Sequence, residues 1–292
     1  MKLVVMIPAF NDEKVIGHVV KRIPRRIKGI KKVEVLVIDD GSVDDSAKTA
    51  KKAGADKVVF HKRNLGLGVT FMHGLKIALE MNADIIVNID SDNQYDGEEI
   101  PNLIQPILEK KCDIVLGSRF TGCIEEMPMD KFIGNKILNF FVSLLIGFKI
   151  SDAQTGFRAF TKEAASKMNS LSIYTYTQET ILEAMKHKLR IIEVPCTFRK
   201  RYDNKSRLVP NIGVYGLRTS KEILRWLRTY RPLEFFAIIT ISTIIVGLIS
   251  NLSWLSIGLS ILILDMVLYG LSEFMIEKRR RLIKNLDKEI LY

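Results

Sequence analysis

Three short clusters of acidic and polar side chains could bind a charged ligand, and each follows an apolar run. They lie at residues 11–13 (Asn-Asp-Glu), 39–42 (Asp-Asp-Gly-Ser) and 90–92 (Asp-Ser-Asp). Turns and helix N-caps also favour Asp, Asn and Ser, so a single cluster is weak evidence for a binding site. If the apolar runs are parallel strands of one sheet, the clusters meet at its carboxyl edge, where ligand crevices form. Their convergence predicts a polar ligand site there.

Among these clusters, Asp90 and Asp92 are the most specific indication of a binding site. They follow the apolar run 85–89, and where the chain bends at the end of a strand both carboxylates can address one cation. Carboxylate oxygens with no His or Cys beside them in the sequence suit Mg²⁺ or Mn²⁺. An ion of this kind bridges to phosphate oxygens and neutralises the charge of a leaving group. We therefore expect a nucleoside diphosphate donor bound through a divalent metal ion.

Two glycine motifs for phosphate binding are incomplete. The sequence has no Gly-x-x-x-x-Gly-Lys-Ser/Thr P-loop. Gly66 and Gly68 are followed by Phe71, where the dinucleotide-binding pattern has its third glycine. Neither pattern therefore supports a P-loop or a dinucleotide-binding fold.

Short apolar runs alternate with helical patterns in the part of the chain that carries the clusters. Strands are expected at 3–7, 33–38, 58–60, 85–89 and 114–116, and helices at 13–26, 44–53, 69–81 and 100–110. This alternation predicts an α/β fold, with a mostly parallel sheet and helices on both faces.

Length and composition are typical of one catalytic domain with an appendage. The chain has 292 residues, of which 47% are hydrophobic and 26% charged, and a formal net charge of +11. This apolar content excludes a disordered chain. The three cysteines are isolated in the sequence, which favours a reducing compartment and excludes a zinc ribbon. The N-terminus does not resemble a signal peptide.

Three segments after the first part predict contact with a membrane. Residues 131–150 carry apolar side chains at helical spacing, as in a core helix or an amphipathic interfacial helix, and we favour the interfacial helix. Residues 211–231 predict a basic juxtamembrane amphipathic helix. Residues 232–272 are too long for one span of the ~30 Å hydrocarbon core, so we expect two transmembrane helices that turn at Asn251. A soluble helical hairpin is the alternative.

Charge predicts how this hairpin is oriented. Arginines precede it, and a charged tail at 273–292 follows it. The positive-inside rule then places the catalytic domain and both termini in the cytoplasm, at the cell membrane. Asp265 within the second span would face a partner helix or another subunit, so the hairpin is a candidate homo-oligomer contact. Because the basic residues gather around the apolar segment, we expect membrane lipids and no nucleic acid as partners.

Several ordered motifs resemble family 2 glycosyltransferases, in particular the dolichyl-phosphate mannose synthase-like branch that glycosylates polyprenyl phosphates. They lie at 5–13, 39–44, 64–68, 90–94, 117–119, 152–158, 194–195 and 205–208. The resemblance implies a GT-A fold over the catalytic domain, residues 1–210. It also implies an inverting transfer of one sugar from a UDP- or GDP-sugar to dolichyl or another polyprenyl phosphate.

The resemblance also implies roles for individual residues. The base and ribose would be held by Pro8, Phe10, Glu13 and Asp40, and the metal and diphosphate by Asp90, Asp92 and Gln94. Ser91 would also contact the nucleotide sugar. The lipid phosphate would be held by Arg119, Lys131 and Asn135, with Asp92, Arg119 and Lys131 as the catalytic residues. Lys131 stands where the family pattern has Arg, which binds phosphate with two parallel hydrogen bonds. Residues 175–179 are closer to archaeal relatives that use UDP-sugars.

The chemistry of such a transfer agrees with these residue types. A lipid phosphate is already an anionic nucleophile near neutral pH, so it needs capture, orientation and charge neutralisation rather than a general base. Lys205 and Arg207 are further candidates for holding it. The basic runs 199–201 and 205–207 are also of the kind that anionic lipid head groups attract.

Three other functions are alternatives. A sugar nucleotidyltransferase would need a glycine-rich loop after the first strand, where this chain has Pro-Ala-Phe-Asn. A processive polysaccharide synthase would need more spans and a Gln-x-x-Arg-Trp element, and here Glu222 stands in place of the Gln. A catalytically inactive membrane scaffold or lipid-binding protein is the third alternative, and the intact acidic residues argue against it.

Overall fold

The computed structural model describes residues 1–168 and 176–201, isolated positions between 224 and 264, and residues 290–291. Among these residues, the strands are β1 (Lys2–Ala9), β2 (Lys32–Asp39), β3 (Lys57–His61), β4 (Ile85–Asn88), β5 (Ile114–Ile124), β6 (Arg158–Thr161), β7 (Ile191–Phe198) and β8 (Ile290–Leu291). The helices are α1 (Glu13–Lys21), α2 (Ser46–Lys52), α3 (Leu67–Glu80), α4 (Ile100–Leu108), α5 (Met129–Ile146), α6 (Lys162–Lys167) and α7 (Thr177–Lys186), with a 3-10 turn, η1 (Gly97–Glu99), before α4.

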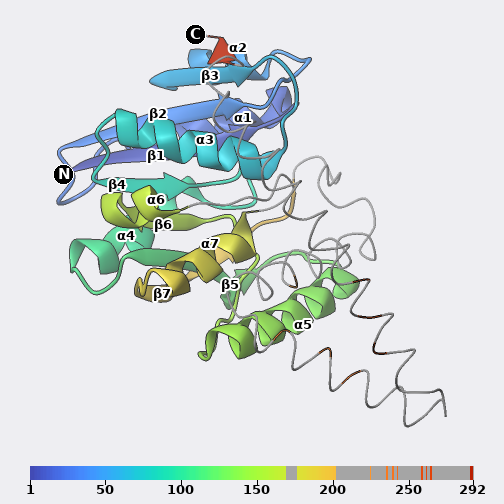
Figure 1. Cartoon of the computed structure of the whole chain (residues 1–292). Coiled ribbons are helices and arrows are strands. Elements are labelled where there is room, and N and C mark those ends of the chain that lie inside the picture. Colours follow the sequence, from blue (N-terminus) through green and yellow to red (C-terminus); the bar gives the residue numbers. More distant parts are fainter. Residues whose placement is uncertain are drawn as a thin grey trace. The chain divides into compact units, whose positions relative to one another are not determined.

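The strands form one sheet in the order β7-β5-β6-β4-β1-β2-β3-β8 (Figure 1). β1 pairs in parallel with β2 and β4, β2 with β3, and β5 with β7. β6 lies antiparallel between β4 and β5, and β8 pairs antiparallel with β3 at the far edge. The sheet is therefore mostly parallel, as the alternating pattern predicts. All five expected strands and all four expected helices of the first part are present, whereas β6, β7, β8, α6 and α7 were not predicted.

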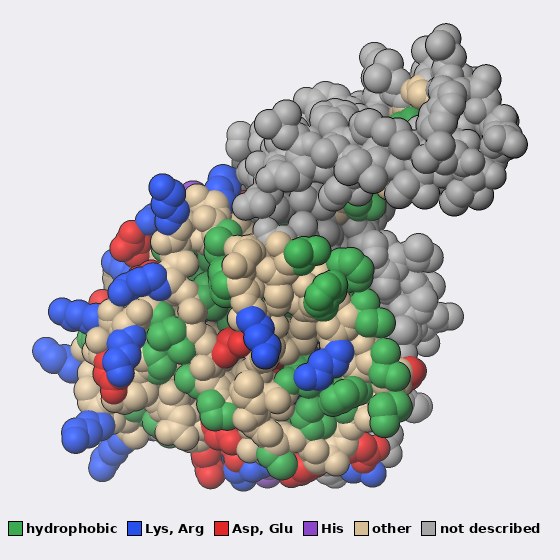
Figure 2. All heavy atoms as spheres, turned by 90° about the horizontal axis from the view of Figure 1, so that it is seen from below, with side chains coloured by type: hydrophobic (Ala, Val, Ile, Leu, Met, Phe, Trp, Pro, Cys, Tyr) green, Lys and Arg blue, Asp and Glu red, His purple; other side chains and the backbone are tan. Residues whose placement is uncertain are grey.

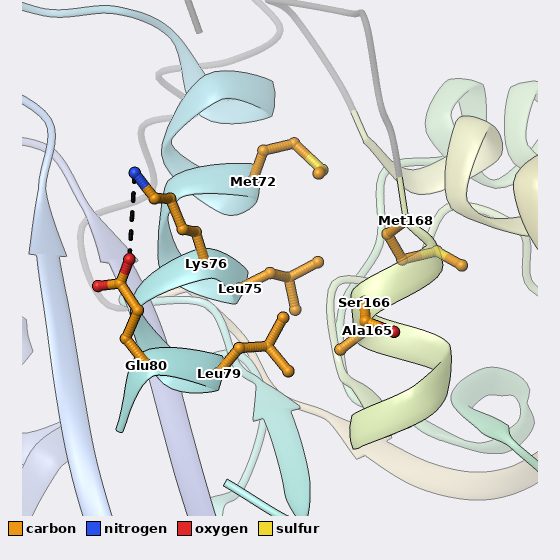
Figure 3. Close-up of a pocket in the computed structure, with 8 residues that line it drawn as sticks. All are labelled: Met72, Leu75, Lys76, Leu79, Glu80, Ala165, Ser166 and Met168. Atoms are coloured by element: carbon orange, nitrogen blue, oxygen red, sulfur yellow. Dashed lines mark ion pairs between the residues drawn. The ribbon is translucent and has the colours of Figure 1, made fainter. Parts of the chain in front are cut away.

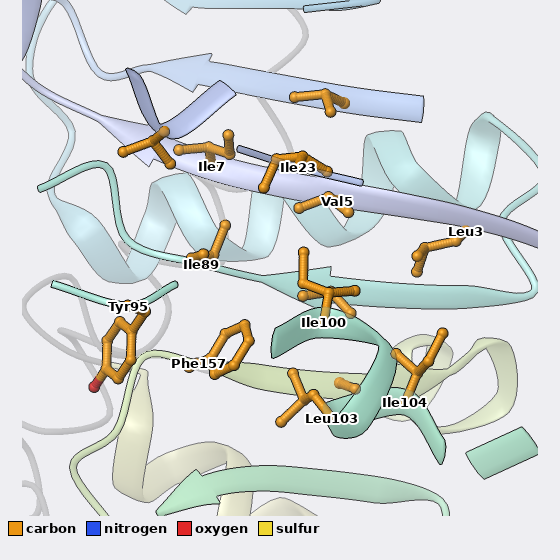
Figure 4. Close-up of a cluster of buried hydrophobic side chains, with 14 of the residues drawn as sticks. Leu3, Val5, Ile7, Ile23, Ile89, Tyr95, Ile100, Leu103, Ile104 and Phe157 are labelled. Carbon is orange, nitrogen blue, oxygen red and sulfur yellow. The ribbon is translucent and has the colours of Figure 1, made fainter. Parts of the chain in front are cut away.

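Alternate side chains of β1 pack into the two layers of the core. Leu3, Val5 and Ile7 point to one face, where they join side chains of α1 and α4 in a buried cluster (Figure 4). Met6 points to the opposite face, where α3 packs so closely that a Cβ on Gly74 would lie 3.1 Å from its Sδ. Such burial on both faces is the reason why central parallel strands are continuous apolar runs.

The helix predicted at 131–150 is α5, which ends at Gly147 in the left-handed conformation typical of a helix C-terminus. Its apolar side chains are largely exposed, including those of Met129, Ile133, Ile137, Phe140, Phe141 and Leu144. Figure 2 shows hydrophobic side chains concentrated toward the side on which α5 lies in Figure 1. The buried Asn139 fastens the helix to the following loop, because its Nδ2 donates to Ser151 O and its Oδ1 accepts from Ala153 N at 2.9 Å. The exposed stripe agrees with an amphipathic helix.

The chain divides into two compact units, one formed by Met1–Ile212 with Leu286–Tyr292 and the other by Gly213–Asn285. The predicted juxtamembrane helix at 211–231 and the hairpin at 232–272 lie outside the described residues, apart from isolated helical positions. Within the part that is described, no helix combines the length and the apolar character that crossing a bilayer requires. Residues 290–291 of the predicted tail form the edge strand β8.

Candidate active site at the carboxyl edge of the sheet

The three polar clusters meet at one edge of the sheet, as predicted. The loops after β1 and β4 are joined because Ser91 Oγ donates to a carboxylate oxygen of Asp12 at 2.6 Å. The loops after β1 and β2 are joined because the amide of Asn11 donates to Ser42 Oγ at 2.8 Å, and the amide of Asp12 to Ser46 Oγ at 2.7 Å. These bonds link residues that are 31 to 79 positions apart in the sequence.

Asp40 fastens a neighbouring loop to this edge. Its buried carboxylate accepts hydrogen bonds from the amides of Leu65 and Gly66, both at 2.8 Å, and lies 2.7 Å from His61 Nδ1. Gly41 adopts φ 74°, and a Cβ there would lie 2.4 Å from the backbone of Arg63, so only glycine fits this approach. Asp40 therefore connects the loops that follow β2 and β3.

The other residues predicted to hold the base and ribose lie at or just after the end of β1. Pro8 is buried near the end of β1, Phe10 is partly exposed, and Glu13 is exposed at the first position of α1. Glu13 Oε2 also accepts a hydrogen bond from the amide of Asp45 at 3.4 Å. The structure thus places these residues on adjacent loops of one edge.

Asp90 lies in a tight, charged environment. A Cβ on Gly156 would be 2.4 Å from its Oδ2, so the carboxylate rests directly against the glycine backbone. Burial and the nearby negative charge of Asp92 raise the pKa of Asp90 to about 7, although the charges of Arg201 and Arg119 act in the opposite direction. A bound cation would stabilise the charged carboxylate.

Asp92 and Gln94 converge on one point beside Asp90. Asn93 between them adopts φ 62°, a left-handed conformation that Asn tolerates, and Gln94 N donates to Asp92 Oδ1 at 3.0 Å. The guanidinium of Arg201 forms an ion pair with Asp92 Oδ2 and donates to Gln94 Oε1 at 2.9 Å. Asp92 and Gln94 thus share the guanidinium of Arg201 as a cationic partner.

This donor set suits a metal ion that shares its coordination with a ligand. Among the described residues, no group of three or more His, Cys, Asp or Glu side chains is arranged to hold a metal ion. Two carboxylates and one amide oxygen would leave coordination positions for water and a diphosphate, as Mg²⁺ sites commonly do. The predicted ligands Asp90, Asp92 and Gln94 are therefore compatible with a metal-diphosphate site rather than a closed protein cage.

Arg119 is buried beside the site and is held by Asp152. Its Nε and Nη2 donate to the two carboxylate oxygens at 2.7 and 2.8 Å, which leaves Nη1 outside this pair. Its guanidinium carbon also lies 5.0 Å from the ring centroid of Phe198. Although burial alone would lower the pKa of Arg119, the negative groups around it, including Asp152, raise it. Arg119 is thus a fixed positive charge.

Lys131 on α5 lies close to Arg201. Burial and the positive charge of Arg201 lower the pKa of this lysine. Asn135, one turn later, donates to Met127 Sδ at 3.7 Å. The structure therefore brings Lys131 toward the Asp92–Arg201 pair, whereas the predicted residues Lys205 and Arg207 lie outside the described residues.

Sequence reasoning missed Arg201, Asp152 and Arg158 as individual parts of the site. Arg158 is fully buried and donates to the carbonyls of Thr155 at 2.8 Å and Ala153 at 2.9 Å, so it shapes the loop that presses Gly156 against Asp90. Asp152 and Arg158 fall within a motif already recognised, and Arg201 falls within a basic run. Their types were therefore visible in the sequence, but their partners were not.

A concave surface elsewhere contains none of the predicted site residues. It lies between α3 and α6, has a volume of about 310 Å³, and is lined largely by apolar side chains (Figure 3). Its lining residues are Met72, Leu75, Lys76, Leu79, Glu80, Ala165, Ser166 and Met168.

Comparison with known proteins agrees with this geometry. Residues 4–168 match the family model described as glycosyl transferase family 2. The chain belongs to glycosyltransferase family 2. It is 34% identical over 211 residues to the UDP-N-acetylglucosamine–dolichyl-phosphate N-acetylglucosaminyltransferase of Methanococcus voltae, covering 65% of this chain and 82% of that protein. It is 28% identical to the dolichol-phosphate mannosyltransferase of Pyrococcus furiosus, covering 89% of this chain and 74% of the relative.

The family's GT-A-like α/β fold is also found among solved structures. Glucosyl-3-phosphoglycerate synthase from Mycobacterium tuberculosis, in complex with Mn²⁺, UDP-glucose and phosphoglyceric acid, superposes with a TM-score of 0.62. The match has 22% sequence identity and covers 77% of this chain and 79% of the other. The resemblance to the dolichyl-phosphate mannose synthase-like branch of the family, predicted from the motifs, is thus confirmed.

Proposed function

We propose that this chain is an inverting, metal-dependent glycosyltransferase that moves one sugar from a UDP- or GDP-sugar to a polyprenyl phosphate. The observation that carries the proposal is the convergence of Asp90, Asp92 and Gln94 with the cations Arg119 and Lys131 at one sheet edge. The donor and the acceptor are both anionic, so both need positively charged partners. This edge of the sheet combines such charges with oxygen ligands for a metal ion. The names of the two relatives support a dolichyl or polyprenyl phosphate as acceptor.

Asp90, Asp92 and Gln94 are the residues that would hold Mg²⁺ or Mn²⁺. When bound, the ion would neutralise the diphosphate leaving group. A structural neighbour that binds Mn²⁺ with UDP-glucose on the same fold supports a divalent ion. The loop that Asp40 fastens would carry the base and ribose, together with Pro8 and the side chains after β1.

The remaining residues would capture and orient the acceptor. Arg119 is held rigidly by Asp152, so its Nη1 can bind a phosphate oxygen without loss of conformational freedom on binding. Lys131 would add a second positive charge. An acceptor phosphate oxygen then forms a bond to the anomeric carbon while the bond to the diphosphate breaks. This single in-line displacement inverts the configuration, needs no general base and releases the nucleoside diphosphate.

The exposed apolar side of α5 supports a reaction at a membrane surface. Phe140 is 63% exposed and Leu144 68% exposed on the helix that also carries Lys131. Aromatic and aliphatic side chains of this kind partition into the interface of a bilayer. We propose that the catalytic domain works on the cytoplasmic face of the cell membrane, and that the hairpin predicted at 232–272 provides a homo-oligomer contact.

Product analysis tests the proposal. Full-length protein in membranes or detergent is incubated with a polyprenyl phosphate, Mn²⁺ and each of a set of radiolabelled UDP- and GDP-sugars. We expect one donor to give an organic-soluble product from which mild acid releases the sugar. The Glu109→Gln variant, in which an exposed carboxylate is neutralised, should give the same product. A protein that binds nucleotide sugars but forms no lipid-linked product with any of them would contradict the proposal and favour an inactive scaffold.

A further inference from the structure

Arg201 occupies the position that the proposed metal ion would need. Its guanidinium forms an ion pair with Asp92 Oδ2, and its Nε and Nη2 donate to Gln94 Oε1 at 3.2 and 2.9 Å. These oxygens belong to two of the three residues that would hold the ion. A guanidinium and a divalent cation that share this pair of oxygens would repel each other at short range, so Arg201 competes with the ion.

The backbone holds Arg201 next to the site. Arg199 N donates to Gln94 O at 2.7 Å, and Gln94 Nε2 donates to Arg199 O at 3.3 Å. Tyr95 and Phe198 form a β-bridge just before this contact. Arg201 is thus only two residues beyond the backbone contact between Arg199 and Gln94. Its side chain is therefore present near Asp92 at a high effective concentration when it competes with free ions.

The two arginines of this segment have different surroundings. Arg199 forms an ion pair with Asp96, whose carboxylate also accepts hydrogen bonds from Arg22 Nε at 3.0 Å and Nη2 at 2.8 Å. That pair therefore connects three segments of the fold. Arg201 instead contacts Asp92 and Gln94, both at the ligand edge.

Charge balance explains why the site would hold an internal cation. Asp90 and Asp92 are two carboxylates only two positions apart directly after β4, and like charges at such short range repel each other. The guanidinium reduces this repulsion while no metal ion is bound. It does so with charge-assisted hydrogen bonds, which are stronger than neutral ones.

We infer that Arg201 is an internal cation that occupies the divalent metal site and is displaced when the ion binds. The inference rests on the proposed function, because it assumes that Asp92 and Gln94 are metal ligands. The dissociation constant for the metal ion is then higher than it would be if Arg201 did not contact these oxygens. Metal binding is also coupled to a movement of the Arg201 side chain away from Asp92 and Gln94.

Manganese titration of the full-length protein without nucleotide tests this competition. The free Mn²⁺ signal in electron paramagnetic resonance gives the dissociation constant directly, and activity is not needed. We expect Arg201→Gln to bind Mn²⁺ about tenfold more tightly than the wild type, the size of effect that loss of one charge-assisted hydrogen-bonded competitor produces. Arg201→Lys keeps the charge but loses the planar fork, so its affinity should lie between the two.

Two matched variants separate displacement from simple charge removal. Lys200→Gln removes the neighbouring positive charge, which forms an ion pair with Glu126, and should leave Mn²⁺ affinity unchanged. Lys131→Gln removes a nearby charge that acts on the site only through space, and should strengthen binding by less than Arg201→Gln. Thermal unfolding of each variant checks that it is folded.

The outcomes distinguish this inference from the proposed function. If Mn²⁺ binds and Asp92→Asn weakens it, but Arg201→Gln binds no more tightly than the wild type or Lys131→Gln, the displacement model is wrong and the metal site stands. If no variant binds Mn²⁺, the metal-dependent function fails as well. Tighter binding by Arg201→Gln alone supports the displacement of an internal cation.

Discussion

The two halves of the ligand edge are stabilised by different interactions. The loops after β1, β2 and β3 are joined mainly by hydrogen bonds from backbone amides, such as those that Ser42 Oγ accepts from Asn11 and that Asp40 accepts from Leu65 and Gly66. The half next to β5 and β7 is joined by ion pairs, such as Asp92–Arg201 and Arg119–Asp152.

This difference matches the ligands that each half would bind. Backbone amides are fixed donors, so the first half can present a rigid wall to a neutral base and ribose. Ion pairs can exchange one partner for a charged ligand, so the second half can bind a metal ion, a diphosphate or a lipid phosphate. Rigid shape and exchangeable charge are thus placed at two parts of the same sheet edge.

The largest expected effect comes from removing a carboxylate in the charged half. Asp92→Ala should lower the rate of transfer about 1000-fold, because the charge on the departing diphosphate is no longer compensated. The protein should remain folded and membrane-bound. Transfer rates at saturating Mn²⁺, compared with the Glu109→Gln variant, measure this effect. Full activity of Asp92→Ala, or of the wild type in excess chelator, would contradict the metal assignment.

Gly156→Ala tests whether the charged half depends on close packing. The added Cβ would lie 2.4 Å from Asp90 Oδ2, so the carboxylate or the loop must move. We expect activity to fall about 100-fold and the free energy of unfolding to fall by about 1–3 kcal/mol. Steady-state kinetics and thermal unfolding measure the two effects.

The matched control for this variant is Gly134→Ala on α5, where a Cβ would meet no atom within 4 Å. It should keep its activity and gain up to about 1 kcal/mol from the higher helix propensity of Ala. Equal losses in both glycine variants would show that contact with Asp90 is not the cause.

Asp40→Asn is expected to damage the hydrogen-bonded half selectively. The amide side chain cannot accept from every donor that the carboxylate serves, so a buried N–H loses its partner at a cost of about 1–3 kcal/mol. Because the affected loop would carry the nucleotide, the KM for the donor should rise about tenfold or more while kcat changes little. Kinetics with varied donor concentration check this expectation, and a change confined to kcat would show that Asp40 acts on the chemical step instead.

A smaller effect is expected from the apolar surface next to the charged half. Phe140→Ser removes a side chain that is 63% exposed, so the free energy of unfolding should change by less than about 0.5 kcal/mol. The KM for a long-chain polyprenyl phosphate should rise several-fold, while that for a short-chain phosphate should not change. Parallel assays with both acceptors make the comparison, and equal changes in both would exclude a role for α5 in contacting the lipid chain.

Much of the ligand edge was predictable, because its signals are local. A buried parallel strand is a continuous apolar run, and the turn after it carries polar residues, so β1, β2 and β4 and their clusters are visible in the sequence. The extra elements were harder to predict. β6 has only four residues and is inserted antiparallel between β4 and β5, a pairing that no local pattern specifies.

The residue sequence by itself determined the alternation of strands and helices, the family, and the acidic residues at the strand ends. These features depend on side-chain periodicity and on the order of short motifs, which are properties of neighbouring positions. Tertiary structure decided which charge meets which partner: Arg201 meets Asp92 across 109 positions, and Arg119 meets Asp152 across 33. Such pairs depend on how strands are ordered in the sheet and on which charges burial forces together, and both are decided only when the whole core packs.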